Sequence, residues 1–222
     1  MPLYYAALLG LSTTTRLLLD AGADVNAQGG EYGNALQAAS EEGHEQVVKT
    51  LLNAGADVNA QGGEYSNALQ TASYRGHEQV VKTLLNAGAN ANAQGGEYGN
   101  ALQAASEEGH EQVVKTLLNA GADVNAQGGE YGNALQAASL EGYEQVVKTL
   151  LNAGADVNAQ GGEYSNALQT ASYRGHEQIV KTLLNAGADV NAQGGRYSNA
   201  LQAASYRGHQ QVAKTLLEAG AH

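Results

Sequence analysis

Apolar positions along this chain follow one pattern that returns every 33 residues. In residues 28–60, Leu36 and Ala39 lie three positions apart in a short run that ends near Gly43. A second run follows, in which Val47, Val48, Leu51 and Leu52 form a broad apolar stripe. Spacings of three and four residues indicate one face of a helix, so each unit is predicted to contain two short amphipathic helices. The polar, Gly- and Asn-rich segment between successive pairs predicts a long loop or hairpin.

The 33-residue unit organises almost the whole chain, and a period in this range is typical of a solenoid built by stacking. The copy in residues 94–126 is identical to that in residues 28–60. We expect one elongated domain over residues 1–222, because each unit of a solenoid packs on its neighbours. Its predicted divisions are a partial repeat at 1–27, full repeats at 28–60, 61–93, 94–126, 127–159 and 160–192, and a C-terminal repeat at 193–222.

Residues with defined backbone roles mark the helix ends. Asn34 followed by Gln37 has the spacing of a capping box, which predicts that the first helix begins there. Gly43 and Gly55 are expected to close the two helices in the left-handed conformation. The Gly29-Gly30 pair is expected to supply the positive backbone angles of the hairpin.

Composition and charge exclude several functions. The chain has no cysteine, so a disulfide framework or a thiolate-bound metal is impossible, and a reducing compartment is compatible with it. The net charge of −11 disfavours nucleic acids and anionic membranes as partners. No apolar run approaches the roughly 18 residues that span a bilayer. We therefore expect an intracellular, cytoplasmic protein that binds neither nucleic acid nor membrane.

Ser40 and His44 lie one helical turn apart and recur in other units, which raises the question of a nucleophile and base. Catalysis needs a single converging constellation with an oxyanion hole, whereas these near-copies are spread along a stack. Histidines in adjacent layers, about 8–10 Å apart, are also too far apart to share one zinc ion. We therefore predict no catalysis, no metal and no cofactor, and expect His44 to cap the second helix and bond to a neighbouring loop.

The unit resembles the ankyrin repeat. Three motifs carry the resemblance: Ala39, Gly43 and His44 in Ala-x-x-x-Gly-His, the run Val-Val-Lys-x-Leu-Leu at 47–52, and Ala-Gly-Ala-Asp-Val-Asn-Ala at 54–60. The resemblance implies an all-α solenoid of helix-turn-helix units with projecting hairpin loops, which binds proteins through a concave groove. The variant Gln-Gly-Gly-x-Tyr-x-Asn-Ala-Leu-Gln is similar to near-identical arrays at the C-terminal end of fungal NOD-like receptor NTPases, where the array is the recognition part.

The units differ most at the two residues before the glycine that closes the first helix. The pair is Glu-Glu in two units, Tyr-Arg in three and Leu-Glu in one, and such drastic exchanges are expected only at solvent-facing positions. Tyrosine and arginine are common binding hot spots. The predicted partner-binding residues are Glu41, Glu42, Tyr74, Arg75, Glu107, Glu108, Leu140, Glu141, Tyr173, Arg174, Tyr206 and Arg207, together with Arg196 near the C-terminal end.

Two milder columns vary with this one: Gly or Ser at Gly33 and its equivalents, and Ala or Thr at Ala38 and its equivalents. By resemblance, they line the same surface. Neutral drift at solvated positions is the alternative explanation of the variation. A tyrosine at Tyr32 and each equivalent position is predicted to pack as a spacer under the hairpin, rather than to offer an aromatic strip to a ligand.

The favoured function is a monomeric, non-catalytic module that binds a protein partner across several layers, as the sensor array of a larger fungal receptor-like protein. The alternative is a designed or consensus ankyrin scaffold without a natural ligand. An enzyme would require a unique residue cluster, which the sequence does not contain.

Overall fold

The computed structural model describes residues 1–63 and 65–222, and it consists of short helices joined by turns and loops. No strand is formed in the described residues, where only two isolated bridges occur, Gly128 with Gly132 and Gly161 with Ser165. The helices are α1 (Pro2–Leu8), α2 (Ser12–Asp20), α3 (Ala35–Glu41), α4 (Glu45–Asn53), α5 (Ala68–Tyr74), α6 (Glu78–Asn86), α7 (Ala101–Glu107), α8 (Glu111–Asn119), α9 (Ala134–Glu141), α10 (Glu144–Asn152), α11 (Ala167–Arg174), α12 (Glu177–Asn185), α13 (Ala200–Arg207) and α14 (Gln210–Glu218).

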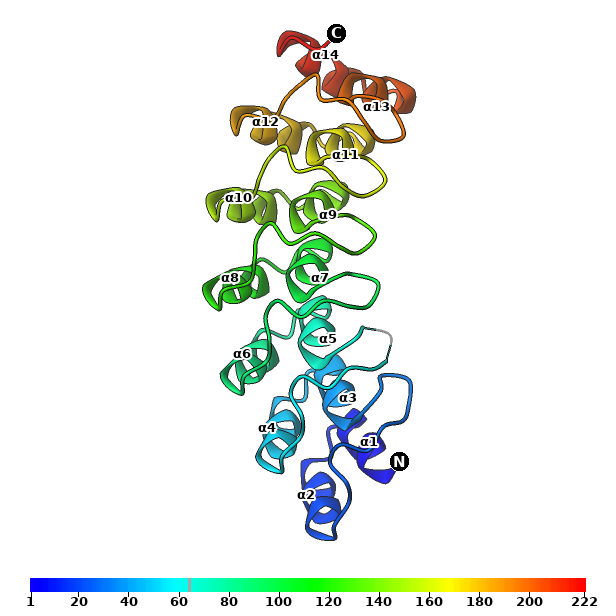
Figure 1. Cartoon of the computed structure of the whole chain (residues 1–222), viewed down its shortest axis with the longest axis vertical. Coiled ribbons are helices and arrows are strands. Elements are labelled where there is room, and N and C mark those ends of the chain that lie inside the picture. The colour runs from blue at the N-terminus through cyan, green and yellow to red at the C-terminus, as the bar shows by residue number, and fades with distance from the viewer. Residues whose placement is uncertain (64) are drawn as a thin grey trace.

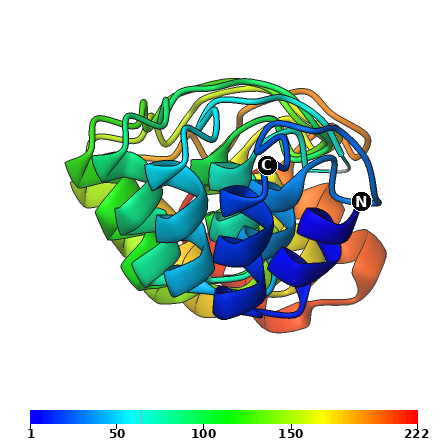
Figure 2. The same ribbon diagram turned by 90° about the horizontal axis from the view of Figure 1, so that it is seen from below.

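The helices stack in two columns, and the two chain ends lie at opposite ends of the stack (Figure 1). Odd-numbered helices form one column and even-numbered helices the other, with each helix contacting the equivalent helix of the next unit. The loops project together from one side, as the view along the stack also shows (Figure 2). In Figure 1 the stack is bowed, with the loops on the inner side of the bend. The predicted solenoid of helix pairs is confirmed.

The core consists of equivalent side chains in successive layers. Leu51 and Val48 of α4 are completely buried, and so are their equivalents in most other even-numbered helices. The odd-numbered helices contribute alanines such as Ala39, also completely buried, whose small size lets neighbouring helices approach closely. Burial of each leucine stabilises the fold by about 2 kcal/mol. The repeated apolar pattern of the sequence is therefore the packing pattern between layers.

Helix ends follow the predictions, with one correction. The Asn34 side chain accepts a hydrogen bond from the Gln37 backbone amide at 2.9 Å, and Gly43 and Gly55 adopt φ angles of 72° and 89°. The Gln37 side chain, however, does not reach back to complete the capping box. Its Nε2 donates to the Gly62 carbonyl of the next unit at 2.7 Å, so this glutamine joins two layers.

The repeated histidine also joins layers rather than capping its own helix. His44 occupies the position before α4 but makes no capping hydrogen bond there. Its Nε2 lies 3.1 Å from the Leu8 carbonyl at the end of α1, and His77 lies 2.8 Å from the Glu41 carbonyl in the same way. The histidines thus satisfy carbonyls at the end of the preceding unit's first helix.

Helices of the described part of the chain are at most nine residues long. None is long and apolar enough to cross a membrane.

Candidate binding surface

The variable pair lies at the C-terminal end of each odd-numbered helix, and its two members have different surroundings. The second residue is exposed at Glu42, Arg75, Glu141, Arg174 and Arg207, and Glu108 is partly exposed. The first residue was also expected to face solvent, and that expectation is wrong for Glu41 and Leu140, each only 4% exposed. Tyr74, Glu107 and Tyr173 are half-buried, and Tyr206 is exposed. The first residue is therefore at least half-buried in every full unit before the last one.

The tyrosines of the variable pair stack on the hairpin tyrosines. The Tyr74 ring centroid lies 5.1 Å from that of Tyr65 in its own unit and 4.7 Å from that of Tyr98 in the next unit. Such ring pairs contribute about 0.5–1.5 kcal/mol beyond area burial. Tyr65 itself is 7% exposed, which agrees with the packing role predicted for the hairpin tyrosines.

The same arrangement recurs toward the C-terminal end. Tyr173 lies 4.8 Å from Tyr164 and 5.1 Å from Tyr197, and Tyr197 lies 4.9 Å from Tyr206. The Tyr-Arg units therefore contribute an aromatic cluster that connects hairpins to helix ends. Tyr164, Tyr173 and Tyr197 are half-buried in this cluster, whereas most of the Tyr206 side chain is available to a partner.

The arginines of the predicted site are engaged within the chain. Arg75 Nε donates to Glu41 Oε1 at 2.6 Å, and this ion pair raises the pKa of the arginine. Arg174 Nη2 lies 3.5 Å from Glu141 Oε1, and Arg196 Nη1 lies 2.8 Å from Glu163 Oε1. Each pair connects one unit to the next. In the pairs of Arg174 and Arg196, the side chains are 36–60% exposed, so they can exchange partners at low cost.

Arg207 has an aromatic neighbour. Its guanidinium carbon lies 4.8 Å from the centre of the Tyr173 ring, which belongs to the preceding unit. A cation over a ring face is attracted by its quadrupole. All four arginines of the predicted surface therefore already make contacts that bridge successive units.

Glu107 occupies the position of Glu41 in an identical unit, but its environment differs. No Lys or Arg takes the place of Arg75, because the next unit carries Glu141 there. Burial raises the pKa of Glu107 to about 7, with further increases from Glu108, Glu141 and Glu97 and an opposing hydrogen bond from Tyr131. One Glu107 oxygen, Oε2, is buried without a hydrogen-bond partner. The middle of the surface therefore holds a carboxylate that is destabilised at neutral pH.

Replacing Glu107 by glutamine is expected to change how stability depends on pH. A folded-state pKa of about 7 means that the folded protein binds this proton more tightly than the unfolded chain. The contribution of Glu107 to the free energy of unfolding is fully present below pH about 4.5 and is lost as the pH rises to about 7. At pH 8, Glu107→Gln should raise the free energy of unfolding by about 1 kcal/mol, a value that allows for the partial exposure of the side chain. Near pH 4.5 the substitution should leave the free energy of unfolding unchanged.

Denaturant titrations at pH 4.5, 6 and 8 test this expectation. The matched control is Glu42→Gln, which removes one exposed carboxylate from the identical unit and is expected to change the free energy of unfolding by less than about 0.5 kcal/mol. A Glu107→Gln protein whose stability runs parallel to that of the wild type across this range would contradict the assignment.

One of the two milder variable columns lies in the core rather than on the surface. Thr71 and Thr170, which replace alanine in two units, are 2% and 4% exposed, and their hydroxyls donate to the carbonyls of Asn67 and Asn166 at 2.8 Å. The serines that replace glycine adopt left-handed backbone conformations, as in Ser66 with φ of 74°. The expectation that these columns line the groove is therefore wrong for the threonines, which are in the core.

Residues considered for catalysis and metal binding lie apart. Ser40 Oγ donates to the Leu36 carbonyl within its own helix at 2.7 Å, while His44 faces the preceding unit. Among residues 1–63 and 65–222, no group of three His, Cys, Asp or Glu side chains is arranged to hold a metal ion.

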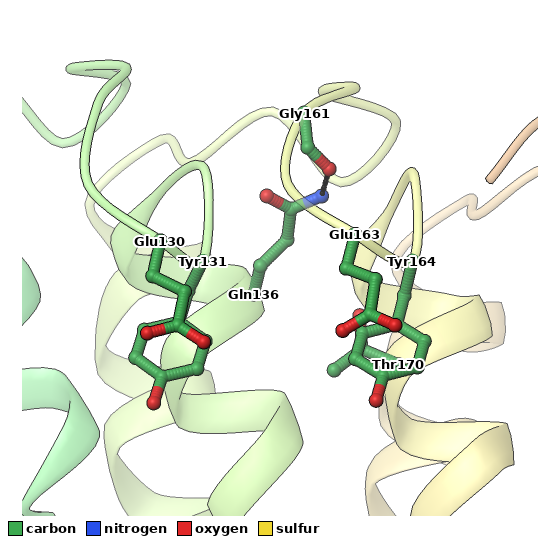
Figure 3. A pocket seen from close by; sticks show the side chains of 7 residues that line it. All are labelled: Glu130, Tyr131, Gln136, Gly161, Glu163, Tyr164 and Thr170. Atoms are coloured by element: carbon green, nitrogen blue, oxygen red, sulfur yellow. Dashed lines mark hydrogen bonds between the residues drawn. The ribbon is translucent and has the colours of Figure 1, made fainter. Parts of the chain in front are cut away.

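A pocket opens between the fourth and fifth full units (Figure 3). Gln136 projects between the Tyr131 and Tyr164 hairpins, and its Nε2 donates to the Gly161 carbonyl at 2.9 Å. Its amide oxygen is buried without a hydrogen-bond partner. The pocket is lined by Glu130, Tyr131, Gln136, Gly161, Glu163, Tyr164 and Thr170. This glutamine column was interpreted from the sequence only as a helix cap. The sequence signal that could have shown its burial is that the same polar residue stands within an apolar run in every full unit.

Comparison with known families agrees with this architecture. The family model described as ankyrin repeats (3 copies) matches residues 1–62, 37–128, 69–161 and 134–222, which together cover the whole chain. The chain belongs to the ankyrin-repeat family. Ankyrin repeats are generally protein-interaction modules, and their fold is typically non-catalytic.

Solved ankyrin-repeat structures superpose on the chain. The human ASB11 ankyrin repeat domain is 25% identical, with a TM-score of 0.88, and the match covers 100% of this chain and 99% of that domain. An ankyrin repeat domain from Acinetobacter baumannii AYE is 32% identical with a TM-score of 0.75, covering 85% of this chain and 98% of that domain. These matches confirm the ankyrin solenoid.

A curated relative shares part of the array. The azaphilone pigments biosynthesis cluster protein L of Monascus ruber is 58% identical over 55 residues, which are 22% of this chain and 12% of that protein. The chain therefore spans a small part of this relative's length, and resemblance to the C-terminal arrays of fungal receptors is a separate hypothesis.

Proposed function

We propose that the array binds a protein partner on the side formed by the hairpin loops and the ends of the odd-numbered helices. The observation that carries this proposal is the position of the variation. Units that share the same core differ at the ends of these helices, where Glu42, Arg75, Glu141, Arg174 and Arg207 are exposed. A scaffold that keeps its packing while its charges vary on one side is suited to recognition of an elongated partner.

The partner is expected to contact several consecutive layers. A standard protein interface buries about 800 Å² on each side, more than one short helix end can supply. Charge on this side changes along the stack: arginines occur in the second, fifth and last units, whereas residues 94–142 contribute only acidic charges to the loops and odd-numbered helices. Such a pattern favours a partner with complementary charge and fixes its direction along the array.

The biological setting is part of the proposal. We infer a single monomeric domain over residues 1–222 that serves as the recognition part of a larger fungal receptor-like protein in the cytoplasm. The similarity to a Monascus ruber protein supports a fungal setting. The absence of cysteine is compatible with a reducing compartment.

The binding proposal is tested by reversing charges on the proposed surface and comparing the result with the same charge reversal on the opposite column of helices. The double variant Arg174→Glu, Arg207→Glu changes two exposed side chains on the proposed surface, and its capture of partners from a fungal extract is expected to fall at least tenfold. Crosslinking followed by mass spectrometry should place captured proteins against the loops.

The matched control is Lys115→Glu, Lys181→Glu, which makes the same charge change on α8 and α12 of the other column. Circular dichroism checks that both proteins fold. Equal capture by the two folded variants, or a loss confined to the lysine variant, would place the interaction elsewhere.

A further inference from the structure

The last unit carries a different charge from the other full units on the loop side of the stack. Its hairpin and first helix, residues 193–209, contain Arg196 and Arg207 and no Asp or Glu. The equivalent residues of each preceding full unit contain at least one glutamate, and the hairpin position of Arg196 is a glutamate in all of them. This end of the loop side is therefore locally positive on a chain whose net charge is −11.

Arg207 differs from the equivalent arginine of the second unit because no carboxylate neutralises it. Arg75 is bound by Glu41, which belongs to the preceding unit. One unit before Arg207, the chain carries Tyr173 and Arg174 instead of an acid. In the part of the chain that the structure describes, Arg207 makes no ion pair, and its side chain is exposed. The order of the units thus leaves this guanidinium available to an external anion.

Two stacked tyrosine rings support the two cations. The guanidinium carbon of Arg207 lies 4.8 Å from the centre of the Tyr173 ring, and that of Arg196 lies 5.7 Å from the centre of the Tyr197 ring. The two ring centroids are 5.1 Å apart. A hydrogen bond with the Tyr197 hydroxyl lowers the pKa of Tyr173, and the charges of Arg207 and Arg196 lower it further. Both cations therefore act on the same hydroxyl group, and we call these four residues the C-terminal cluster.

The second unit carries similar rings without the same charges. Tyr74 stacks on Tyr98 of the next hairpin, as Tyr173 does on its own partner. The hairpin residue before Tyr98, however, is Glu97 rather than an arginine, and Arg75 is already neutralised. Stacked tyrosines thus occur at both places, whereas two arginines beside them occur in the C-terminal cluster.

The exposure of the two arginines allows a partner to reach them. Arg196 donates to Glu163 at 2.8 Å, but these side chains are 60% and 50% exposed, so another carboxylate can compete for the arginine at low cost. A guanidinium that stacks on a ring keeps its N–H groups at its edge, where they can bind a carboxylate in a bidentate manner. A long polyanion is disfavoured, because it would also meet the acidic units in residues 94–142.

We propose that the C-terminal cluster binds carboxylates of a short acidic segment of the partner protein through Arg196 and Arg207. This inference rests on the proposed function and names the chemistry of the partner at this end of the array. The segment supplies to Arg207 the carboxylate that the second unit's arginine receives from within the chain. It also fixes the direction of the partner, because residues 94–142 repel the same segment.

Fluorescence anisotropy of dye-labelled ligands tests the inference on the whole chain. The probe is hexaglutamate, compared with hexaglutamine and with a thymidine oligonucleotide of about 20 nucleotides. At physiological ionic strength, charges beyond about 8 Å are screened, so direct contacts dominate. Hexaglutamate is expected to bind about tenfold more tightly than hexaglutamine, as two exposed ion pairs allow. The oligonucleotide, which must extend over the acidic units, is expected to bind more weakly than hexaglutamate.

Two variants assign the binding to the C-terminal cluster. Arg196→Glu restores the glutamate of the other full units and is expected to remove the preference for hexaglutamate. Its control, Lys181→Glu, makes the same change in net charge on α12 of the other column and should keep the preference. Tyr173→Leu keeps all charges and introduces the residue that Leu140 provides in the fourth unit. It removes the ring beneath Arg207 and should weaken hexaglutamate binding about threefold. Circular dichroism checks that each variant folds.

The inference is overturned if the wild type binds hexaglutamate and hexaglutamine equally, or if folded Arg196→Glu keeps the preference. It is also overturned if Lys181→Glu loses the preference to the same extent, which would indicate overall charge alone. Tighter binding of the oligonucleotide than of hexaglutamate would assign the cluster to phosphate instead.

The capture experiment with the double charge-reversal variant distinguishes these failures from failure of the proposed function. If capture is lost in that variant while the peptides bind equally, the binding function stands and the acidic chemistry of the partner is wrong. Unchanged capture would remove the proposed function, and with it the assignment of the C-terminal cluster to the partner, even where hexaglutamate binds.

Discussion

Replacing Gly129 by alanine is expected to lower the free energy of unfolding by about 3 kcal/mol. Gly129 lies in the hairpin after α8 with φ of 63°, a conformation that alanine adopts only with strain. A Cβ atom there would lie 2.6 Å from the carbonyl carbon and oxygen of Tyr98 in the preceding hairpin. Because these are backbone atoms, the two layers must separate to accommodate the methyl group. Denaturant unfolding followed by circular dichroism measures the loss.

Gly121 provides the matched control for this prediction. It has a similar conformation, with φ of 86°, but a Cβ atom there would meet no atom within 4 Å. Gly121→Ala should therefore cost only the backbone strain, about 1 kcal/mol. Equal losses in the two variants would mean that strain alone, and not the contact between hairpins, determines the effect at Gly129.

Local structure was predictable from the sequence because its determinants lie within one unit. Asn34 caps the first helix, and glycines such as Gly43 close the helices in left-handed conformations. The spacing of Val48 and Leu51 also identified the buried stripe of the second helix. Each of these features depends on residues a few positions apart, so a single copy of the repeat carries the information.

The candidate surface was less predictable because its contacts join different units. Variation at Tyr74 was interpreted as evidence of exposure, yet this ring stacks on Tyr98 from the next hairpin. The hairpin tyrosines are the same in every full unit, so the exchange at this position is tolerated because the Tyr74 side chain is only half-buried. The position of the column at the helix ends was foreseeable from the sequence, whereas its division into an inward and an outward residue required the placement of the hairpins.

The two identical units illustrate this dependence. Glu41 and Glu107 have the same neighbours in sequence for many residues, but Glu41 is bound by Arg75 of the following unit, whereas Glu107 meets Glu141. The difference could have been anticipated by comparing each residue with the one 34 positions later. Identical sequence therefore gives the same helices but not the same electrostatic environment, and binding properties are set by the order of the units.

Replacing Arg75 by alanine should reveal how much the order of the units along the chain contributes to stability. Glu41 is 4% exposed, its Oε1 is bound by Arg75, and its Oε2 has no hydrogen-bond partner. Arg75→Ala would leave a buried carboxylate unpaired, a change that costs about 3–5 kcal/mol for a fully buried pair. Because 44% of the Arg75 side chain is exposed, a loss of about 2 kcal/mol at pH 7 is expected.

Two further variants separate this ion pair from loss of arginine packing. Arg174→Ala removes the equivalent arginine in the fifth unit, whose partner Glu141 is 3.5 Å away and 36% exposed, so it should cost less than about 0.5 kcal/mol. Adding Glu41→Gln to Arg75→Ala should recover much of the lost stability, because a neutral amide is less costly to bury than an unpaired carboxylate. Denaturant titrations measure all three proteins. Two results together would contradict this account: equal losses of stability in Arg75→Ala and Arg174→Ala, and no recovery in the double variant. They would show that solvent already compensates the charge of Glu41. The two identical units would then be electrostatically equivalent.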